Sequence, residues 1–354
     1  MTRRQLHARQ PYFGRSPAAP DRPSEAHVKH PSPSARQDTA HHVPTGTPAA
    51  GHPEPLDRAA GRREDAAWLR AAWERESTRV LPLAEGRTHV SEGPDGWRLA
   101  LVRPRDCPPD GTRYFLGTDR TGAAYFAYAT GRLPAPPTGT ARVAALDDGA
   151  YPLGDRDHGM LVHATALENW HRTHGRCPRC GDPTAVECGG HVRRCGACGA
   201  EHHPRTDPAV LMLITDADDR CLLGSRTRWP AHQYSVLAGY VEPGETAEAA
   251  VRREAAEEAG VAIGAVRCVE TEAHPFPGSL MLGYEAGAVS SAARADGSEM
   301  AAVRWFTRDA LAHAVRTGDV ALPDRRYLAR RLVERWYGGP LDPAPESAGA
   351  PWTE

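Results

Sequence analysis

The residues from Gly239 to Val261 read G-Y-V-E-P-G-E-T-A-E-A-A-V-R-R-E-A-A-E-E-A-G-V, a glycine-containing loop followed by a strongly helix-forming run. Thr246 is predicted as the N-cap, because its hydroxyl can accept a hydrogen bond from a backbone N–H of the first turn. The alanines, arginines and glutamates that follow are good helix formers, and Gly260 supplies the left-handed residue at which helices commonly end. The stretch therefore predicts a loop that leads directly into a helix between Thr246 and Gly260.

Three carboxylates lie on one face of this predicted helix. Glu254, Glu257 and Glu258 stand at positions i, i+3 and i+4, within one turn of each other. Without a partner they would repel one another, and a bound divalent cation would remove that cost. All-oxygen ligands favour Mg²⁺ or Mn²⁺ over zinc or copper. A solvated acidic helix face is the alternative, and it is the usual meaning of clustered glutamates.

The loop before the helix argues against the alternative. Its glycines, Gly239 and Gly244, allow the backbone to approach a metal or a phosphate closely. Glu245 and Arg253 form an opposite-charge pair that can join this loop to the helix. A metal site at the loop–helix junction is the favoured interpretation.

The composition of the chain limits its function classes. Its 354 residues suffice for two or three domains, and a formal charge of −2 provides no overall field to attract nucleic acid or an acidic membrane. Lys29 is the only lysine among 43 basic residues, so arginine-rich runs are weak indicators of binding. No apolar run reaches the length of a membrane span and no hydrophobic signal core is visible, which predicts a cytoplasmic protein with no membrane partner.

The first part of the chain predicts an extension and a small domain. Residues 1–55 are rich in Pro, Arg, Ser, Ala and His without hydrophobic periodicity, which predicts a disordered extension. Residues 56–167 predict an α+β domain without a catalytic constellation of its own. Its strands and a tyrosine-rich surface favour a scaffold or dimerisation domain, and hence a homodimer. The helices and strands expected there lie at 66–73, 78–83, 97–102, 113–117 and 123–128, with a further helix from 159 onwards.

Two C-x-x-C pairs follow, each succeeded by glycine. Cys177 and Cys180 are separated from Cys195 and Cys198 by fourteen residues, a spacing typical of a four-cysteine zinc ribbon over 168–204. Four thiolates close the coordination shell, so the predicted Zn²⁺, one per chain, is structural. Cys188 and His191 are spare potential ligands within the ribbon loop.

Residues 205–337 alternate between predicted strands and helices, and residues 338–354 predict a frayed tail. Strands are expected at 210–214, 221–225, 233–237, 265–272, 280–286 and 302–306, and helices, besides the one after Thr246, at 309–315 and 325–336. This order predicts an α/β fold, an α/β/α sandwich preceded by the zinc ribbon and the small α+β domain.

The stretch quoted at the outset resembles the Nudix box. The matching positions have fixed spacing and are Gly239, Glu245, Arg253, Glu254, Glu257, Glu258, Gly260 and Val261. Ala255 departs from the pattern, since a larger aliphatic residue is usual there, and this indicates a change in packing. The resemblance implies structural roles for Gly239, Glu245, Arg253 and Gly260, and catalysis by Glu257 or Glu258, without deciding which of these two is the general base.

From about Leu56 onwards the chain is similar to the NADH pyrophosphatase branch, whose members also act on NAD-capped RNA. The similarity depends on the order of an N-terminal domain, Glu168-Asn-Trp-His171, the ribbon, Pro204-Arg205, the box and a Pro-Phe-Pro-x-Ser motif. It implies metal-dependent hydrolysis of the pyrophosphate bond of NADH or NAD to NMN(H) and AMP. It also adds Glu299 and the Ala238 carbonyl to Glu254, Glu257 and Glu258 as ligands of Mg²⁺ or Mn²⁺.

The same resemblance implies a dinucleotide-binding set, in which Phe276 is expected to stack on a base. The family's usual Ser-Gln-Pro-Trp opening is Thr271, Glu272, Ala273 and His274 here, so the substrate preference is expected to be relaxed. Glu272 is expected to face a sugar hydroxyl or solvent. The implied substrate-binding residues are His203, Glu272, Ala273, His274, Pro275, Phe276, Pro277, Gly278, Ser279 and Ala329.

Three other functions compete with this prediction. A broader hydrolase of nucleoside-diphosphate compounds such as ADP-ribose would use the same box. A nucleotide sensor without hydrolysis is disfavoured, because such sensors typically lose box carboxylates and this chain keeps them. Nucleic-acid binding by the ribbon arginines (Arg176, Arg179, Arg193, Arg194 and Arg205) is disfavoured by the arginine bias of the whole chain.

Overall fold

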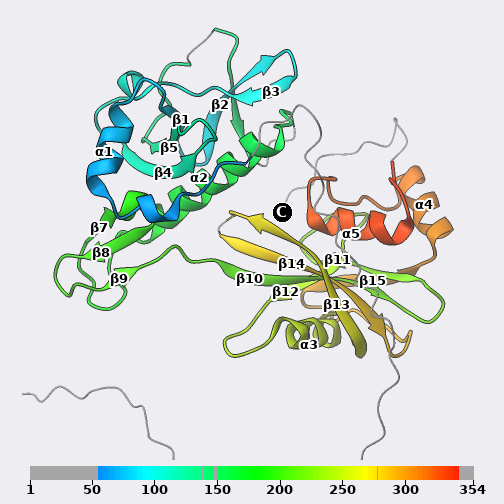
Figure 1. Ribbon diagram of the computed structural model, residues 1–354. Helices are drawn as coiled ribbons and strands as arrows, with labels where there is room; N and C mark the ends of the chain where they lie inside the picture. Colours follow the sequence, from blue (N-terminus) through cyan, green and yellow to red (C-terminus); the bar gives the residue numbers. More distant parts are fainter. Residues whose placement is uncertain (1–54, 137–138, 147–149, 277, 343–354) are drawn as a thin grey trace, which may run out of the picture. The chain divides into compact units, whose positions relative to one another are not determined.

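The computed structural model describes residues 55–136, 139–146, 150–276 and 278–342 (Figure 1). The predicted extension, apart from Pro55, lies outside these residues, as do residues 343–354 of the predicted tail and Pro277 of the predicted substrate set. No helix of the described part is long and apolar enough to cross a membrane.

The first group of elements forms two small sheets against two helices. One sheet has the order β1-β5-β4, with β1 parallel to β5, and the other has the order β3-β2-β6. Strands β2 and β6 were not predicted, because short strands with polar residues carry little periodic signal. The elements are α1 (Ala66–Glu74), β1 (Arg79–Leu83), β2 (Arg87–Gly93), β3 (Gly96–Leu99), β4 (Thr112–Thr118), β5 (Ala124–Ala129), β6 (Arg142–Ala145) and α2 (Asp155–Thr173), with one-turn 3-10 helices η1 (Ala60–Arg62) and η2 (Pro104–Asp106).

Helix α2 ties this group to the ribbon. The Glu168 carboxylate, buried in the core, accepts the backbone N–H groups of Glu85 (3.0 Å) and Gly86 (2.6 Å) at the turn between β1 and β2. Both turn residues have positive φ, and the helix thereby satisfies the N–H groups of a tight hairpin. The helix continues across the predicted boundary between residues 167 and 168, so the first domain and the ribbon share it.

The expectation of a tyrosine-rich surface was wrong. Tyr114, Tyr125 and Tyr128 are at most 7% exposed. They lie on β4 and β5, which are neighbouring strands of one sheet and contribute to apolar clusters on both of its faces. Strands covered on both faces bury tyrosine rings that an exposed sheet would leave on the surface.

The zinc-ribbon segment is a three-stranded sheet of order β7-β8-β9. Its strands are short because the two cysteine loops interrupt them. They are β7 (Thr184–Glu187), β8 (Val192–Cys195) and β9 (Glu201–His202), with the one-turn helix η3 (Cys188–Gly190) between the first two.

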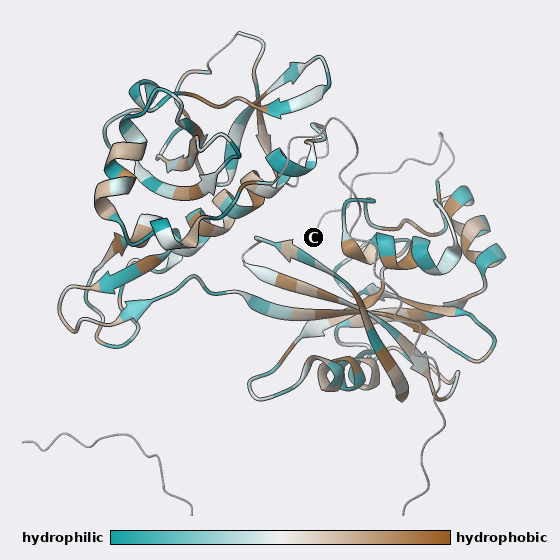
Figure 2. Ribbon diagram, in the orientation of Figure 1, coloured by the Kyte–Doolittle hydropathy of each residue, from teal (hydrophilic) through white to brown (hydrophobic). Residues whose placement is uncertain are grey.

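The remaining elements form an α/β/α sandwich, as predicted. A six-stranded mixed sheet of order β13-β14-β10-β11-β15, with β12 also paired to β10, has α3 on one face and α4 and α5 on the other (Figure 1). Figure 2 shows apolar residues concentrated along the central strands between these helices. The elements are β10 (Asp207–Thr215), β11 (Cys221–Arg226), β12 (Leu237–Tyr240), α3 (Ala247–Ala259), β13 (Ile263–His274), β14 (Ser279–Ala288), β15 (Met300–Phe306), α4 (Arg308–Thr317) and α5 (Leu328–Tyr337).

Several predicted boundaries differ from the structure; helix α2, for example, begins at Asp155 instead of 159, and two further differences have a visible cause. The strand expected over 233–237 begins only at Leu237, because Gln233 and Ser235 make isolated bridges rather than a ladder. The last helix begins at Leu328 instead of 325, because the Asp324 carboxylate accepts the backbone N–H of Arg326 (2.9 Å) and holds a turn there.

The pairing of β10 prepares the position of the site. One edge of β10 is shared between β12, paired from Ala209 to Met212, and β11, paired at Ile214 and Thr215. Because two different strands occupy this one edge, β11 and β12 separate beyond it, and the residues at their ends line a cavity described below.

Candidate active site

Helix α3 has the predicted ends. The Thr246 hydroxyl accepts the backbone N–H of Ala249 (3.2 Å), and Gly260 ends the helix with a φ of 66°. Ala250, Val251, Ala255 and Ala259 are fully buried against the sheet and fix the rotation of the helix. Ala255 is thus a packing position, as its departure from the box pattern suggested.

Arg253 joins the loop to the helix. Its guanidinium donates to both Glu245 oxygens (3.0 and 2.9 Å), to Glu254 (2.8 Å), to Glu257 (2.9 Å) and to the Tyr240 carbonyl (2.9 Å). The hydrogen bonds to Glu245, more than any other contact, raise the pKa of Arg253. The predicted pair is therefore the centre of a network that holds the loop, and two of the clustered carboxylates, in place.

Gly239 lets β12 lie against the Glu254 carboxylate. A Cβ at this position would lie 1.9 Å from Glu254 Cδ and 2.0 Å from Oε1, closer than any nonbonded carbon can approach. The Glu254 side chain is 12% exposed, and burial raises the pKa of its carboxyl.

Glu258 is the most buried of the cluster. Its side chain is 3% exposed, and neither carboxylate oxygen has a hydrogen-bond partner among the described residues. Burial raises the pKa of Glu258 to about 7, an effect that nearby Arg226 partly offsets and that Glu254 and Glu299 reinforce. Glu257, by contrast, is 59% exposed. The shared helical face therefore directs two carboxylates inward and one outward.

These carboxylates line a cavity of about 890 Å³. It brings together every predicted ligand of the divalent metal: Ala238, Glu254, Glu257, Glu258 and Glu299. His274 and Phe276 of the predicted substrate set lie in its wall. The cavity therefore joins an acidic end to an aromatic one.

The donor set fits a divalent cation. A buried carboxylate whose oxygens lack partners is costly unless a cation or proton compensates it. Carboxylate and carbonyl oxygens are the ligands that Mg²⁺ and Mn²⁺ prefer. Glu258, Glu254 and Glu299 would supply the charge, and Ala238 a backbone oxygen.

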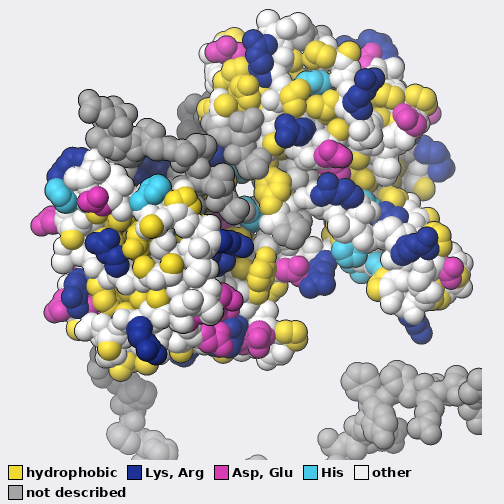
Figure 3. Space-filling view, turned by 180° about the vertical axis from the view of Figure 1, so that it is seen from behind, with side chains coloured by type: hydrophobic (Ala, Val, Ile, Leu, Met, Phe, Trp, Pro, Cys, Tyr) yellow, Lys and Arg dark blue, Asp and Glu magenta, His cyan; other side chains and the backbone are white. Residues whose placement is uncertain are grey.

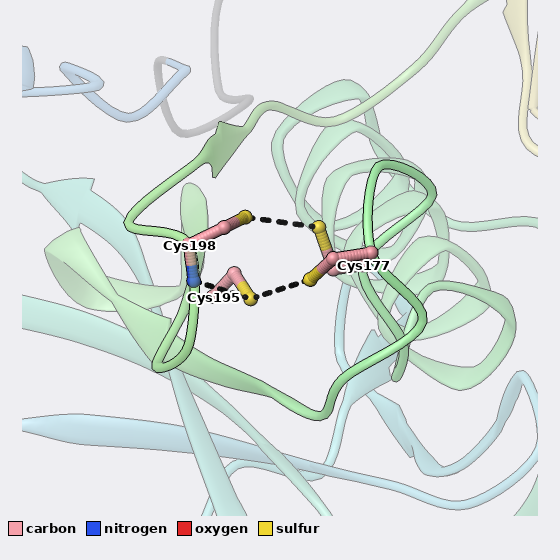
Figure 4. Close-up of side chains that lie close together, drawn as sticks. Cys177, Cys195 and Cys198 are labelled. Atoms are coloured by element: carbon pink, nitrogen blue, oxygen red, sulfur yellow. Dashed lines mark hydrogen bonds between the residues drawn. The ribbon is translucent and has the colours of Figure 1, made fainter. Parts of the chain in front are cut away.

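The four predicted ribbon cysteines converge as well. The sulfur atoms of Cys177, Cys180, Cys195 and Cys198 lie within 4.8 Å of one another, and the labelled side chains point towards a common centre (Figure 4). Two of the contacts are 3.7 Å (Cys177–Cys198) and 3.4 Å (Cys180–Cys195), near the roughly 3.8 Å edge of a tetrahedron with Zn–S bonds of about 2.3 Å. This geometry fits Zn²⁺. His202 Nε2 lies 3.3 Å from Cys177 Sγ and would support that thiolate.

Comparisons with known proteins identify the domains that contain the two sites. The family model described as the NUDIX domain matches residues 205–330, and the model described as the NADH pyrophosphatase zinc ribbon domain matches residues 172–202. A relative from Mycobacterium bovis, the NAD-capped RNA hydrolase NudC, is 34% identical over 247 residues, covering 67% of this chain and 79% of the relative. The chain belongs to the Nudix family, in the branch that carries this zinc ribbon.

Other matches cover less. The NAD-capped RNA hydrolase NUDT12 of Macaca fascicularis is 38% identical over 196 residues, which are 52% of this chain but only 42% of that protein. The chain thus spans less than half the length of this relative. Among solved structures, a NUDIX hydrolase from Nitrosomonas europaea aligns with a TM-score of 0.35 and 23% identity over 47% of this chain and 95% of its own.

The segment from Glu272 to Phe276, which includes the end of β13, differs from one expectation. Glu272 does not face solvent: its carboxylate pairs with Arg331 on α5 at 2.9 Å. Arg331 also pairs with Glu270 at 2.7 Å, so one guanidinium compensates part of the charge of two carboxylates. Glu272, Ala273 and Pro275 line a second cavity, of about 190 Å³, which shares His274 and Phe276 with the first.

Other contacts hold this segment in place. Asn169 Nδ2 donates to the Pro275 carbonyl (2.6 Å), so the Glu168-Asn-Trp-His171 motif supports the loop that carries Phe276. The Gly278 carbonyl accepts the N–H of Asp207 (2.9 Å), and the Ser279 hydroxyl lies 3.3 Å from that of Tyr240. These two residues of the predicted set act at the start of β14.

Besides Gly278 and Ser279, two further residues of the predicted substrate set line neither cavity. His203 is exposed just after β9, and Ala329 is a buried residue of α5 that faces the core. Their direct contact with a substrate remains a prediction.

Among the cavity residues that were not predicted from the sequence, four have charged or aromatic side chains on or beside strands β11 and β12: Arg226, Arg228, Trp229 and Tyr240. Tyr240 is 56% exposed although it is aromatic, and it directly follows the box glycine. Its place inside the box was an available signal. The other three lie on and after β11, and only the separation of β11 from β12 brings them to the cavity.

The ribbon arginines do not form a free basic patch. Arg193 is buried, donating to Thr184 and to His171 Nδ1 (2.8 Å), while Arg194 pairs with Glu187 and Glu201. On the face shown in Figure 3, basic and acidic side chains are interspersed. The disfavoured nucleic-acid function of the ribbon gains no support.

Proposed function

We propose that this protein hydrolyses the pyrophosphate bond of NADH- or NAD-type dinucleotides to NMN(H) and AMP, and removes NAD caps from RNA. The observation that carries the proposal is the single cavity that joins the carboxylate cluster to His274 and Phe276. Its volume of about 890 Å³ lies within the range typical of small-molecule sites. The naming of two relatives as NAD-capped RNA hydrolases supports the same substrate class.

The metal-binding residues are proposed as Glu254, Glu257, Glu258, Glu299 and the Ala238 carbonyl. When bound, Mg²⁺ or Mn²⁺ would neutralise phosphate charge and activate water. Around it, Arg253 holds the Glu254 and Glu257 side chains in place. Either Glu257 or Glu258 takes the proton from the attacking water, and comparing kcat for Glu257→Gln and Glu258→Gln distinguishes them.

The base-binding residues are proposed as Phe276, His274 and Tyr240. Aromatic faces stack on any base, which suits a site whose preference is relaxed relative to the family. The pairing of Glu272 with Arg331 supports continued dinucleotide binding, because it holds the Glu272 carboxylate against α5 and offsets part of its charge, although Arg331 also pairs with Glu270.

The remaining assignments extend the proposal to the whole chain. Residues 56–167 act as a scaffold, 168–204 as a structural zinc ribbon and 205–337 as the hydrolase domain. Cysteines arranged for metal rather than for disulfides support a reducing compartment, the cytoplasm. A homodimer is proposed from the strands of residues 56–167, without the contribution expected from surface tyrosines, and light scattering of the purified protein tests it.

The test is a side-by-side measurement of kcat/KM for NADH, NAD⁺, ADP-ribose, diadenosine polyphosphates and NAD-capped RNA, in wild type and Phe276→Ala. Loss of one stacking surface is worth about 1–3 kcal/mol. It should raise KM roughly 5- to 150-fold with little change in kcat, because a remote ring is bound equally in the ground and transition states.

The main rival is a hydrolase of ADP-ribose-like compounds. A strong preference for ADP-ribose or diadenosine compounds, combined with indifference to Phe276→Ala, would replace the dinucleotide function with that rival. The control variant for Phe276→Ala is Val289→Ala, because Val289 is highly exposed and its truncation should not disturb packing. Substitution of the core residue Phe306 would not serve, since it would destabilise the fold.

A further inference from the structure

Arg226 ends strand β11 at an irregularity in the sheet. The register between β11 and β15 shifts between Ser225 and Arg226, so that Arg226 pairs with Met300. Bulges of this kind re-aim a side chain and occur near active sites. Here the result is that Arg226 lines the cavity of the carboxylate cluster.

The Arg226 guanidinium contacts two of the groups proposed to bind metal. Nη2 donates to the Ala238 carbonyl at 3.0 Å and lies 4.0 Å from Glu258 Oε1. The guanidinium also lies over the Trp229 ring, with Cζ 5.6 Å from its centroid. It is therefore held against the metal-binding groups from one side and supported by an aromatic ring on the other.

One carbonyl oxygen directed at a guanidinium cannot also coordinate a divalent ion in the same direction, and two cations near one buried carboxylate repel each other. We propose that Arg226 is a positioning residue that occupies part of the divalent-metal site when the metal is absent and is displaced from the Ala238 carbonyl when the metal binds. Arg226 thus lowers the affinity for the metal and holds Ala238 and Glu258 in place until it arrives. This inference rests on the proposed function, because it assumes the same metal site.

A consequence follows for substrate binding. Once displaced, the guanidinium remains in the same cavity, since its backbone is fixed in the sheet and the side chain is confined beside Trp229. An arginine there faces the region in which the pyrophosphate must lie to reach the metal, and guanidinium groups bind phosphate in a fork geometry. Arg226 therefore exchanges a carbonyl partner for a phosphate partner.

The test measures Mn²⁺ binding without substrate, in full-length protein with zinc in the ribbon, from the electron paramagnetic resonance signal of free Mn²⁺. The variants are Arg226→Gln, which removes the charge, and Arg226→Lys, which keeps it. Arg252→Gln is the matched control, because Arg252 lies on α3 but donates to the Glu248 and Gly264 carbonyls instead. Arg228→Gln removes a charge from another part of the same cavity wall.

The expected result is that Arg226→Gln lowers the Kd for Mn²⁺ about tenfold, that Arg226→Lys stays within about threefold of wild type, and that Arg252→Gln has no effect. Unchanged or weaker Mn²⁺ binding in Arg226→Gln would overturn the inference. Equal tightening in Arg228→Gln would overturn it too, since only the total charge of the cavity would then matter. If the wild-type protein binds no Mn²⁺, the metal site itself is contradicted. If Arg226→Gln tightens Mn²⁺ binding but the wild-type protein does not hydrolyse NADH, the inference about Arg226 holds and the proposed substrate is wrong.

Discussion

A single missing Cβ decides whether strand β12 can lie against the Glu254 carboxylate. The backbone at position 239 has no positive φ, so conformational freedom is not the reason for this glycine. The reason is the close approach to the Glu254 carboxylate, which leaves no room for a Cβ. Glu258 shows a second constraint on one residue: a carboxylate is retained in a buried position where, without metal, its oxygens have no hydrogen-bond partner among the described residues. Gly239 is explained by packing against a carboxylate, whereas the buried Glu258 is costly in the isolated fold and is explained by a ligand.

We predict that Gly239→Ala displaces the Glu254 side chain. The added methyl group would overlap the Glu254 carboxyl, and overpacking of this kind costs about 1–3 kcal/mol of stability. Mn²⁺ affinity should fall at least about tenfold as the ligand moves. The control is Gly264→Ala, whose Cβ would meet its nearest atoms at 3.7 Å. Equal metal affinities in the two variants would show that Glu254 does not bind the ion.

We predict that Glu258→Gln separates activity from stability. Removing the charge should lower kcat by about 10²–10⁴-fold if Glu258 is the general base. In the metal-free protein the same change should leave Tm unchanged or higher, because a neutral amide is less costly to bury than a carboxylate that has no hydrogen bond and only a 4.0 Å contact with Arg226. Calorimetry with and without Mn²⁺ checks this, and near-normal turnover at saturating metal would contradict the assignment.

At the scale of elements, the ribbon depends on a metal more than on a core. Its strands have two to four residues each, and Val186 is exposed. Sheets this short are not stable by themselves, so the four cysteine sulfurs must supply the stability through a bound ion. Arg193 and His171 then connect the ribbon to α2.

We predict that Cys195→Ser removes the zinc and destabilises the ribbon. Cys195 lies at the end of β8 with its side chain buried, so its loss opens the coordination shell from inside. Purified wild type should contain one Zn²⁺ per chain, and the variant should contain little and give a lower soluble yield. Cys268→Ser, at an exposed position on β13, controls for loss of a thiol. Zinc-free wild type of full stability would rule out the structural role.

At the scale of the whole molecule, several neutral histidines lie between the helices and sheets. Burial lowers the pKa of His191 from 6.5 to about 4, an effect that the Phe115 carbonyl partly offsets, and lowers the pKa of His171 similarly. The hydrogen bonds agree with a neutral His171 ring, since Nδ1 accepts from Arg193 while Nε2 donates to the Gly190 carbonyl (2.8 Å).

We predict that acid destabilises the fold through these rings. Between pH 6.5 and about pH 4 the histidines of the unfolded chain are protonated, whereas the buried rings of the folded chain remain neutral. The contribution of these rings to the free energy of unfolding is therefore complete above pH 6.5 and decreases as the pH is lowered towards 4. The slope is about 1.4 kcal/mol per pH unit per ring. His191→Gln keeps a donor for the Phe115 carbonyl (2.9 Å) without titrating, and should flatten the slope in urea denaturation at about pH 7 and pH 5.

Exposed His232→Gln is the control for this measurement. Zinc content must be followed at both pH values, because loss of the metal from protonated cysteines would also destabilise the ribbon. Identical slopes in wild type and His191→Gln would show that other groups cause the acid sensitivity.

The sequence by itself determined the features that neighbouring residues control. Residue types at short, fixed spacings along the chain predict the ends of α3, the Arg253–Glu245 pair and the two cysteine pairs. Apolar runs predict most strands of the sandwich. Their physical causes, capping, helical periodicity and metal geometry, act locally and are therefore visible in the order of residues.

Only the tertiary structure decided the features that depend on contacts between distant strands. The register shift that brings Arg226 to the Ala238 carbonyl, the pairing of Glu272 with Arg331 and the burial of the tyrosines all require knowing which strand lies beside which. A side chain's partner across a sheet, or on a helix some sixty residues away, is set by packing of the whole domain, which no local pattern encodes. The acidic end of the cavity, with Phe276 and His274, could thus be predicted residue by residue, whereas Arg226, Arg228 and Trp229 needed the fold.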